Sequence, residues 1–157
     1  MKELTLKSII KEYQMDELPA EYRQIVESAI ESTSHSYAPY SHFNVGACLL
    51  LDNGIEIKGC NQENAAFPSG ICAERSAIFA AGAQYPEVGI KAIAIAARTP
   101  QGELTEEPVS PCGPCRQVII ESETRAKHPI RILLYGKKRI FLVEGIKQLM
   151  PLSFTEF

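Results

Sequence analysis

The sequence predicts an α/β fold of three layers, in which a five-stranded mixed sheet has helices on both of its faces. Two observations carry this prediction. Segments with helical spacing alternate with short apolar segments along the chain, which is typical of strand–helix–strand units. The last two apolar segments are separated only by a tight turn, so they are expected to pair antiparallel, because a parallel pair needs a long crossover.

The first half of the chain contains one predicted helix and a hairpin. From about residue 18 to residue 34, apolar residues recur every three or four positions, and this spacing predicts an amphipathic helix. The stretch "FNVGACLLL" at 43–51 predicts a buried strand. The sequence "DNG" at 52–54 is a strong hairpin signal, and "IEIKGC" at 55–60 returns as the antiparallel partner.

The second half continues the alternation of helices and strands. Apart from Lys91, the run "IKAIAIAA" at 90–97 is apolar, which is typical of a central strand covered on both faces. The first fifteen residues contain no motif, and no role is assigned to them. The other predicted elements are a loop at 61–70, a helix at 72–83, a polar loop at 98–110, a helix at 112–122, strands at 130–136 and 139–145, and a short helix at 146–150 that Pro151 stops.

The bulk composition is that of an ordinary soluble protein. A chain of 157 residues predicts a single domain, 1–157, and 45% hydrophobic with 22% charged residues is a globular composition. The net charge of −3 and the absence of a basic patch argue against nucleic acid as a partner. No apolar run reaches membrane-spanning length, and "MKELTLKSII" lacks the apolar core of a signal peptide, so we expect a cytoplasmic protein without a membrane partner.

The cysteines are the first pointer to function. An odd number of them in a cytosolic chain argues against a disulfide framework and favours a metal site or a reactive thiol. The motif "CGPC" at 112–115 alone leaves two interpretations open, a thiol–disulfide exchange pair as in thioredoxin-like proteins or two ligands of one metal ion. The five cysteines are Cys48, Cys60, Cys72, Cys112 and Cys115.

Pro114 places two of these cysteines at the start of a helix. Proline breaks a helix interior because it lacks an N–H, but it is well tolerated in the first turn. The helix is therefore predicted to begin near Cys112, with Cys112 and Cys115 in its first turn, and Cys72 opens the preceding predicted helix. Free N–H groups and the positive end of the helix dipole favour the thiolate form at such positions.

Three thiolates brought together in this way predict a catalytic zinc site. Three protein ligands leave a fourth tetrahedral position for water, whereas a structural site has four protein ligands. Glu74 lies two residues after Cys72, where a carboxylate can exchange protons with that water and with a substrate. This is the arrangement that hydrolytic deamination of a nucleobase requires.

Two alternatives use the same cysteines differently. A thioredoxin-like motif directly follows a strand and is preceded by Trp, but this chain has no Trp, and a polar loop precedes its motif. A closed structural zinc site could take Cys60 as its fourth ligand. That alternative gives no role to Glu74 or to the polar stretch "NQEN" at 61–64.

The ordered motifs resemble those of the small homotetrameric cytidine deaminases. The resemblance extends from about residue 37 to residue 154 and rests on "YAPYSHFNVGA", "GCNQENAAFPSGICAERSAIFAA" and "SPCGPCRQV". The zinc deaminase signature has His or Cys, any residue and Glu, followed later by Pro-Cys-x-x-Cys. A single CxxC is a weak signal, but the whole ordered set is specific, and it implies a cytidine deaminase-like fold.

The resemblance also implies a role for each matched residue. One zinc ion per subunit is expected, and Glu74 would carry protons to N3 of the base and to the departing amine. Asn61 and Glu63 would bind the ribose hydroxyls, and Phe154 would reach the site of a neighbouring subunit in a homotetramer. The implied set is catalytic Glu74, the metal ligands Cys72, Cys112 and Cys115, the substrate contacts Phe43, Asn61, Glu63, Ala73 and Phe154, and Arg75 hydrogen-bonded to a ligand sulfur.

The implied reaction converts cytidine or 2′-deoxycytidine into the uracil nucleoside and ammonia, as in pyrimidine salvage. Antiparallel final strands favour a free nucleoside, since relatives that act on nucleotides typically have a helix inserted there. A related nucleoside such as blasticidin S is the alternative substrate within the family.

Two features depart from the pattern. Gln62 replaces the usual apolar residue in "NxEN", and the 98–110 loop is long and contains Glu106 and Glu107, which would affect substrate access if they border the site.

Overall fold

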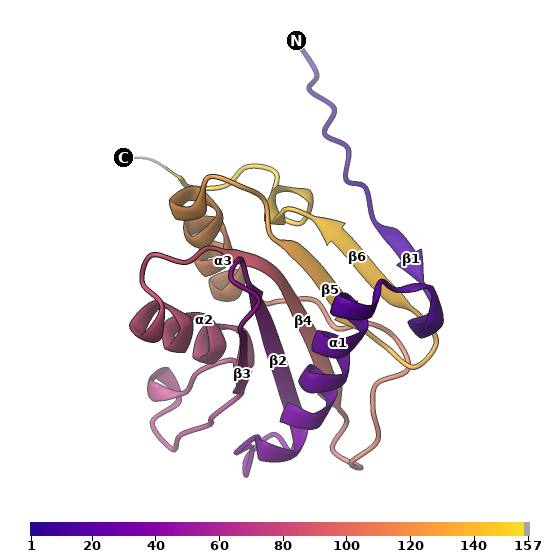
Figure 1. The fold of residues 1–157 in the computed structure, drawn as a ribbon, viewed down its shortest axis with the longest axis vertical. Helices are drawn as coiled ribbons and strands as arrows, with labels where there is room; N and C mark the ends of the chain where they lie inside the picture. The colour runs from indigo at the N-terminus through magenta and orange to yellow at the C-terminus, as the bar shows by residue number, and fades with distance from the viewer. Residues whose placement is uncertain (156–157) are drawn as a thin grey trace.

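The computed structural model describes residues 1–155, which form a mixed sheet with helices on both faces (Figure 1). The strands are β1 (Lys11–Tyr13), β2 (Asn44–Leu51), β3 (Glu56–Cys60), β4 (Ile90–Arg98), β5 (Arg131–Tyr135) and β6 (Ile140–Glu144). The α-helices are α1 (Ala20–Ser32), α2 (Ala73–Gln84) and α3 (Gly113–Ala126). Short 3-10 turns lie at Met15–Glu17, Thr33–His35, Phe67–Ser69 and Ile146–Gln148.

The strand order in the sheet is β1-β6-β5-β4-β2-β3. The β2–β3 hairpin and the β2–β4 pair are antiparallel, whereas β4 and β5 are parallel and are joined by a crossover through α3. The β5–β6 pair is antiparallel, as the tight turn between the two predicted strands requires. The predicted mixed α/β fold is therefore confirmed, and the elements between β2 and β6 occur in the predicted order.

Alternation along β4 shows how the two faces of the sheet are built. Ala92, Ala94 and Ala96 face α1 and pack with its buried side chains, while Ile93 and Ile95 face α2 and α3. All five residues are at most 1% exposed. The apolar run at 90–97 is thus a central strand covered on both faces, as predicted, and the small alanines allow α1 to lie close to the sheet.

The sequence predicts five strands, and the structure adds a sixth at the edge. Strand β1 pairs antiparallel with β6, with Lys11 opposite Leu142 and Tyr13 opposite Ile140. Its three residues, Lys-Glu-Tyr, contain no alternation of apolar and polar side chains, so no sequence pattern identifies them as a strand. The strand forms because β6 offers an unpaired backbone edge, which is a tertiary cause.

Two predicted boundaries change. Helix α3 continues to Ala126, beyond the predicted end at residue 122, and Lys127 follows in the left-handed conformation with φ 59°. The short helix predicted at 146–150 is a single 3-10 turn, Ile146–Gln148. Within the described residues, no helix has the length and apolar character needed to cross a membrane.

Candidate metal and substrate site

Cys72 lies at the N-cap of α2, where the backbone is still extended, with φ −75° and ψ 155°. The chain enters this position through Ile71, which exchanges two backbone hydrogen bonds of 2.9 Å with Gln62. The first turn of α2 packs directly on β3 at Gly59, where a Cβ atom would lie 2.7 Å from the carbonyl oxygen of Ala73. Glycine is required there because any side chain would push the start of α2 away from the sheet.

Cys112 occupies the equivalent N-cap position of α3, with φ −68° and ψ 169°. Pro114 lies in the first turn, so the predicted start of this helix is confirmed. The Arg116 guanidinium donates hydrogen bonds to the carbonyl oxygens of Pro111 at 2.9 Å and Leu149 at 2.6 Å. Arg116 therefore ties the residue before Cys112 to the C-terminal segment.

The two helix starts bring three cysteine sulfurs together. The Sγ atom of Cys112 is 3.7 Å from that of Cys72 and 3.4 Å from that of Cys115, and all three lie within 4.8 Å of one another. Among the described residues this is the one group of His, Cys, Asp and Glu side chains placed to hold a metal ion. Cys60 is not part of it, and its thiol instead donates a hydrogen bond to the carbonyl oxygen of His35 at 3.2 Å.

Hydrogen bonding within the cluster separates the acidities of two thiols. The pKa of Cys72 is lowered to about 5, chiefly by a hydrogen bond with Cys115, and the Arg75 guanidinium at 3.8 Å from the Cys72 sulfur lowers it further. The same hydrogen bond, together with burial, raises the pKa of Cys115. The Cys72 sulfur is therefore a thiolate at neutral pH before any cation binds, whereas a bound cation has to displace the proton of Cys115.

The donor set fits zinc. Soft thiolate ligands at helix N-termini suit Zn²⁺, and three of them leave one tetrahedral position open. Three thiolates and a divalent ion have a net charge of −1, which the Arg75 guanidinium and the two helix dipoles offset. A fourth cysteine, which would make the site closed and structural, is absent from the group formed by residues 1–155.

Glu74 lies beside the cysteines and is only 4% exposed. Burial raises the pKa of its carboxyl, and the negative charge on Cys72 raises it further. Ala73, which precedes it, is fully buried, and its N–H lies in the first turn of α2, where backbone N–H groups have no partner within the helix. A buried carboxyl with a raised pKa beside a metal site holds a proton more readily than an exposed carboxyl, which suits it to proton transfer.

Asn61 follows β3 and binds the start of β2. Its Oδ1 accepts hydrogen bonds from the Ser36 hydroxyl at 2.6 Å and the Val45 N–H at 2.8 Å, and its Nδ2 donates to the Phe43 carbonyl at 2.9 Å. The Asn61 amide is thus held in a fixed orientation. The second N–H of Nδ2 is left for another acceptor.

Glu63 binds the loop before β2 in a similar way. Its Oε2 accepts hydrogen bonds from the backbone N–H groups of Tyr40 at 2.9 Å and Ser41 at 3.2 Å. The Ser41 side chain and these N–H groups lower the pKa of the Glu63 carboxyl, so the group is ionised. The other oxygen, Oε1, is left to accept hydrogen bonds from a ligand.

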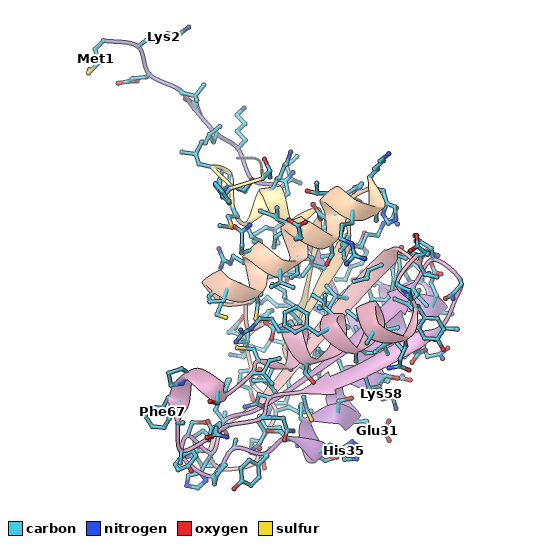
Figure 2. All side chains as sticks on the ribbon, turned by 90° about the vertical axis from the view of Figure 1, so that its left-hand side faces the viewer. Met1, Lys2, Glu31, His35, Lys58 and Phe67 are labelled. Carbon is cyan, nitrogen blue, oxygen red and sulfur yellow. The ribbon has the colours of Figure 1, made fainter. Side chains whose placement is uncertain are left out.

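A cleft of about 530 Å³ opens beside Cys72 and contains Asn61 and Glu63 in its wall. The rings of Tyr40 and Phe67 meet edge to face at its rim, 5.8 Å apart, and Phe67 projects from the body of the molecule (Figure 2). Neither aromatic residue was singled out from the sequence, although each stands within an otherwise polar or small-residue stretch. The cleft is lined by Tyr40, Ser41, Asn61, Gln62, Glu63, Asn64, Phe67, Gly70, Ile71, Cys72 and Arg75.

Besides Cys112 and Cys115, which belong to the cysteine cluster, four predicted site residues lie outside this lining. Phe43 is half-buried directly before β2, and its carbonyl oxygen contacts Asn61. Ala73 and Glu74 lie beneath the cleft in the buried start of α2. Phe154 is 63% exposed, and its carbonyl oxygen accepts a hydrogen bond from the Gln117 side chain at 2.9 Å. In this chain the backbone of Phe154 is therefore bonded to α3.

The 98–110 loop does not line the cleft of its own chain. Glu106 forms an ion pair with Lys137, and Glu107 pairs with Arg139 at 3.1 Å. Backbone N–H groups of Lys137 and Lys138 also donate to this loop at 3.0 Å. The loop is thereby fastened to the β5–β6 turn, so its acidic residues do not border the substrate-side residues of the same chain.

Comparison with known proteins agrees with this geometry. A family model described as the cytidine and deoxycytidylate deaminase zinc-binding region matches residues 19–128. The cytidine deaminase of Mycoplasma pneumoniae is 38% identical over 128 residues, which are 80% of this chain and 82% of that protein. The cytidine deaminase of Halalkalibacterium halodurans is 42% identical over 99 residues, 63% of this chain and 70% of that protein. A crystal structure of cytidine deaminase from Burkholderia pseudomallei matches with a TM-score of 0.73 and 36% identity over 85% of this chain and 98% of that one.

Proposed function

This chain belongs to the cytidine and deoxycytidylate deaminase family, and from that membership we propose that it catalyses hydrolytic deamination of cytidine, 2′-deoxycytidine or both. The products are the uracil nucleoside and ammonia. The observation that carries the proposal is the convergence of three cysteine sulfurs within 4.8 Å beside the buried carboxyl of Glu74. Neither a redox pair nor a structural metal site needs that carboxyl.

Cys72, Cys112 and Cys115 would hold the zinc ion. Zinc, when bound, supplies a Lewis acid that lowers the pKa of a coordinated water toward about 7. Arg75 adds to the lowering of the Cys72 pKa, which the hydrogen bond with Cys115 chiefly causes, and its charge would offset the negative charge of the ligand set.

Glu74 is the proton carrier in this proposal. Its raised pKa favours accepting a proton, which it would give up at N3 of the base and at the departing amine. The buried position excludes bulk water, so the proton stays within the site. The N–H of Ala73, in the first turn of α2, would donate to the base carbonyl.

Asn61 and Glu63 would hold the ribose. Asn61 retains one amide N–H and Glu63 retains Oε1 after their contacts within the chain are counted. One donor and one ionised acceptor suit a sugar hydroxyl pair, because each hydroxyl both donates and accepts. Phe43 is proposed to pack against the base.

Several finer features follow as part of the same proposal. The assembly is a homotetramer with one zinc ion per subunit, and Phe154 reaches the cleft of a neighbouring subunit, which its exposure on α3 permits. Residues 1–157 make up one catalytic domain that works in the cytoplasm in pyrimidine salvage. The antiparallel β5–β6 pair supports a free nucleoside as substrate rather than a nucleotide.

The deciding experiment is a parallel assay of ammonia release from cytidine, deoxycytidine, dCMP and blasticidin S by the zinc-loaded protein. We expect turnover of at least one of the two nucleosides and little or none of dCMP and blasticidin S. Insulin reduction by the metal-free protein is assayed beside it, because a redox protein would show that activity. Turnover of neither nucleoside would overturn the proposal.

A further inference from the structure

The N-terminal segment is an extension that precedes the family region. The family model begins at residue 19, and the Burkholderia pseudomallei structure is matched over 98% of its length while covering 85% of this chain. The extension is anchored at β1, and the Ser8 hydroxyl and Ile9 N–H donate hydrogen bonds to Gln148 at 2.6 and 2.8 Å. Beyond Ser8 the arm, residues 1–7, runs away from the body toward Met1 and Lys2 (Figures 1 and 2).

The arm has the alternating apolar and polar side chains of a β-strand, but it does not belong to the sheet. Leu4 and Leu6 are 79% and 51% exposed and lie two residues apart, so in an extended chain they share one face. Glu3, Thr5 and Lys7 share the other face. Within the described residues, neither Glu3 nor Lys7 forms an ion pair in its own chain. Ordering such an arm costs conformational entropy that its own molecule does not offset.

The sequence Glu3-Leu4-Thr5-Leu6-Lys7 is complementary to itself when read in the opposite direction. In an antiparallel pair centred on Thr5, Glu3 lies opposite Lys7 of the second copy, Leu4 lies opposite Leu6, and Thr5 lies opposite Thr5. Opposite charges, paired aliphatic side chains and paired threonines are each favourable across antiparallel strands. A two-fold axis generates every one of these pairs twice, as an isologous contact requires.

We infer that the arm is a self-association element, in which residues 3–7 of two copies pair antiparallel about a two-fold axis through Thr5. The partner of each arm is therefore the same arm of a second copy of the protein. The four leucines of the pair form one apolar face, and the Glu–Lys pairs lie on the other. Because the arm precedes residues 19–128, which the family model matches, this contact is additional to any assembly through those residues.

Cysteine cross-linking tests the register directly. Residues directly opposite in an antiparallel pair have Cα atoms about 4.5–5.5 Å apart, which suits a disulfide, whereas diagonal neighbours are about 7–8 Å apart and do not. The zinc-loaded full-length Thr5→Cys protein is oxidised with glutathione disulfide. The two introduced thiols lose their protons and join in a disulfide, and glutathione disulfide is reduced to two glutathione thiols. We expect a covalent dimer on a non-reducing denaturing gel, formed at least about fivefold faster than with Leu6→Cys. A mixture of Leu4→Cys and Leu6→Cys proteins should cross-link as a heterodimer, and the parent protein gives the background from its own cysteines.

Charge reversal tests the pairing chemistry in the Thr5→Cys background. Glu3→Lys places like charges opposite each other twice, so cross-linking should slow by about fivefold or more. The double change Glu3→Lys with Lys7→Glu restores opposite charges and should restore the rate. Equal rates for Thr5→Cys and Leu6→Cys, or no rescue by the double change, would overturn the inference. Cytidine turnover is measured in parallel, and its failure would bear on the proposed function and leave the cross-linking result intact.

Discussion

The two helix starts that form the candidate metal site look alike but are built differently. Cys72 and Cys112 are both N-cap residues with extended backbones, and each helix presents its free N–H groups to the same cluster. The start of α2 is packed against β3 at Gly59 and contains the buried Glu74. The start of α3 is more open, since Cys112, Gly113 and Pro114 are exposed.

This difference separates two tasks within one site. The α2 side is fixed by close packing and contains the group that would handle protons, so small changes there should be costly. The α3 side supplies two of the three sulfurs and is held through Arg116 by hydrogen bonds to a loop and to the C-terminal segment. Changes there should loosen metal retention and leave proton chemistry intact. The predictions below test this division, from the largest expected effect to the smallest.

The largest effect is expected for Glu74→Gln on the α2 side. The amide keeps the shape of the carboxyl but cannot carry the proton, so deamination should fall by about a hundredfold to ten-thousandfold. Zinc content, measured by metal analysis of the purified protein, should remain that of the parent. Glu121→Gln, an exposed substitution on α3, is the control and should leave both quantities unchanged. Full activity of Glu74→Gln would remove Glu74 from the mechanism.

The packing difference is tested by alanine at three glycines. In Gly59→Ala the new Cβ would lie 2.6 Å from the Ala77 nitrogen and 2.7 Å from the Ala73 oxygen, so the start of α2 must move, at a cost of about 1–3 kcal/mol in unfolding free energy. Gly113→Ala at the start of α3 meets nothing within 4 Å and should be tolerated. Gly82→Ala, inside α2 and equally free, should stabilise by about 0.5–1 kcal/mol. Thermal unfolding compares the three, and equal stability of the Gly59 and Gly113 variants would contradict the division.

Arg116→Lys tests whether the hydrogen bonds of Arg116 fix the start of α3 and so retain the metal ion. Lysine keeps the charge but cannot donate to Pro111 and Leu149 together, so the segment before Cys112 loses a bond worth about 1–2 kcal/mol. We expect zinc to transfer to a competing chelator about tenfold faster, with the turnover number of the still-loaded protein nearly unchanged. Arg125→Lys, near the other end of α3, is the matched control. A loss of turnover without faster zinc release would place Arg116 in the chemistry instead.

The smallest effect concerns the end of α3 that is remote from the metal ligands. The Asp52 carboxylate, 2.8 Å from the His128 ring, raises the pKa of His128. A raised pKa in the folded state adds stability that is fully present below the ordinary histidine pKa and is lost as pH rises through the folded value. The parent's advantage in unfolding free energy over His128→Gln should therefore be larger near pH 6 than near pH 9. The change in this advantage should be less than about 1 kcal/mol, because the pair is partly exposed. Thermal unfolding at the two pH values measures it, and a constant difference would show that folding does not raise the pKa of His128.

The sequence predicts most of this fold because its signals are local. Apolar runs, the "DNG" turn and Pro114 each act through their immediate neighbours, and the structure confirms the elements that they predict. Strand β1 could not be predicted, because it exists only through its pairing with β6. The sequence predicts too early an end for α3, because the last turn of this helix is polar and lacks an apolar signal.

The parts of the candidate site that the sequence predicts also depend on local signals, and the parts that it does not predict depend on long-range contacts. The N-cap positions of Cys72 and Cys112 follow from local signals, and the strand between the two helices brings them together. Tyr40 and Phe67 were not identified, since their edge-to-face contact joins two loops that are distant in sequence. The ion pairs of the 98–110 loop with the β5–β6 turn are equally long-range and were not anticipated.

The pairing of β1 with β6 has a consequence for the order in which the chain folds. Its register joins Lys11 to Leu142, near the two ends of the sequence, whereas the β2–β3 hairpin joins near neighbours. Contacts between distant residues form late because the entropy of closing a large loop must be offset first. During synthesis the β1 segment leaves the ribosome early but has no partner until the residues of β6 follow. Docking of β1 thus marks the completion of folding, and hydrogen exchange of the backbone amides in Lys11–Tyr13 that pair with β6 would report it.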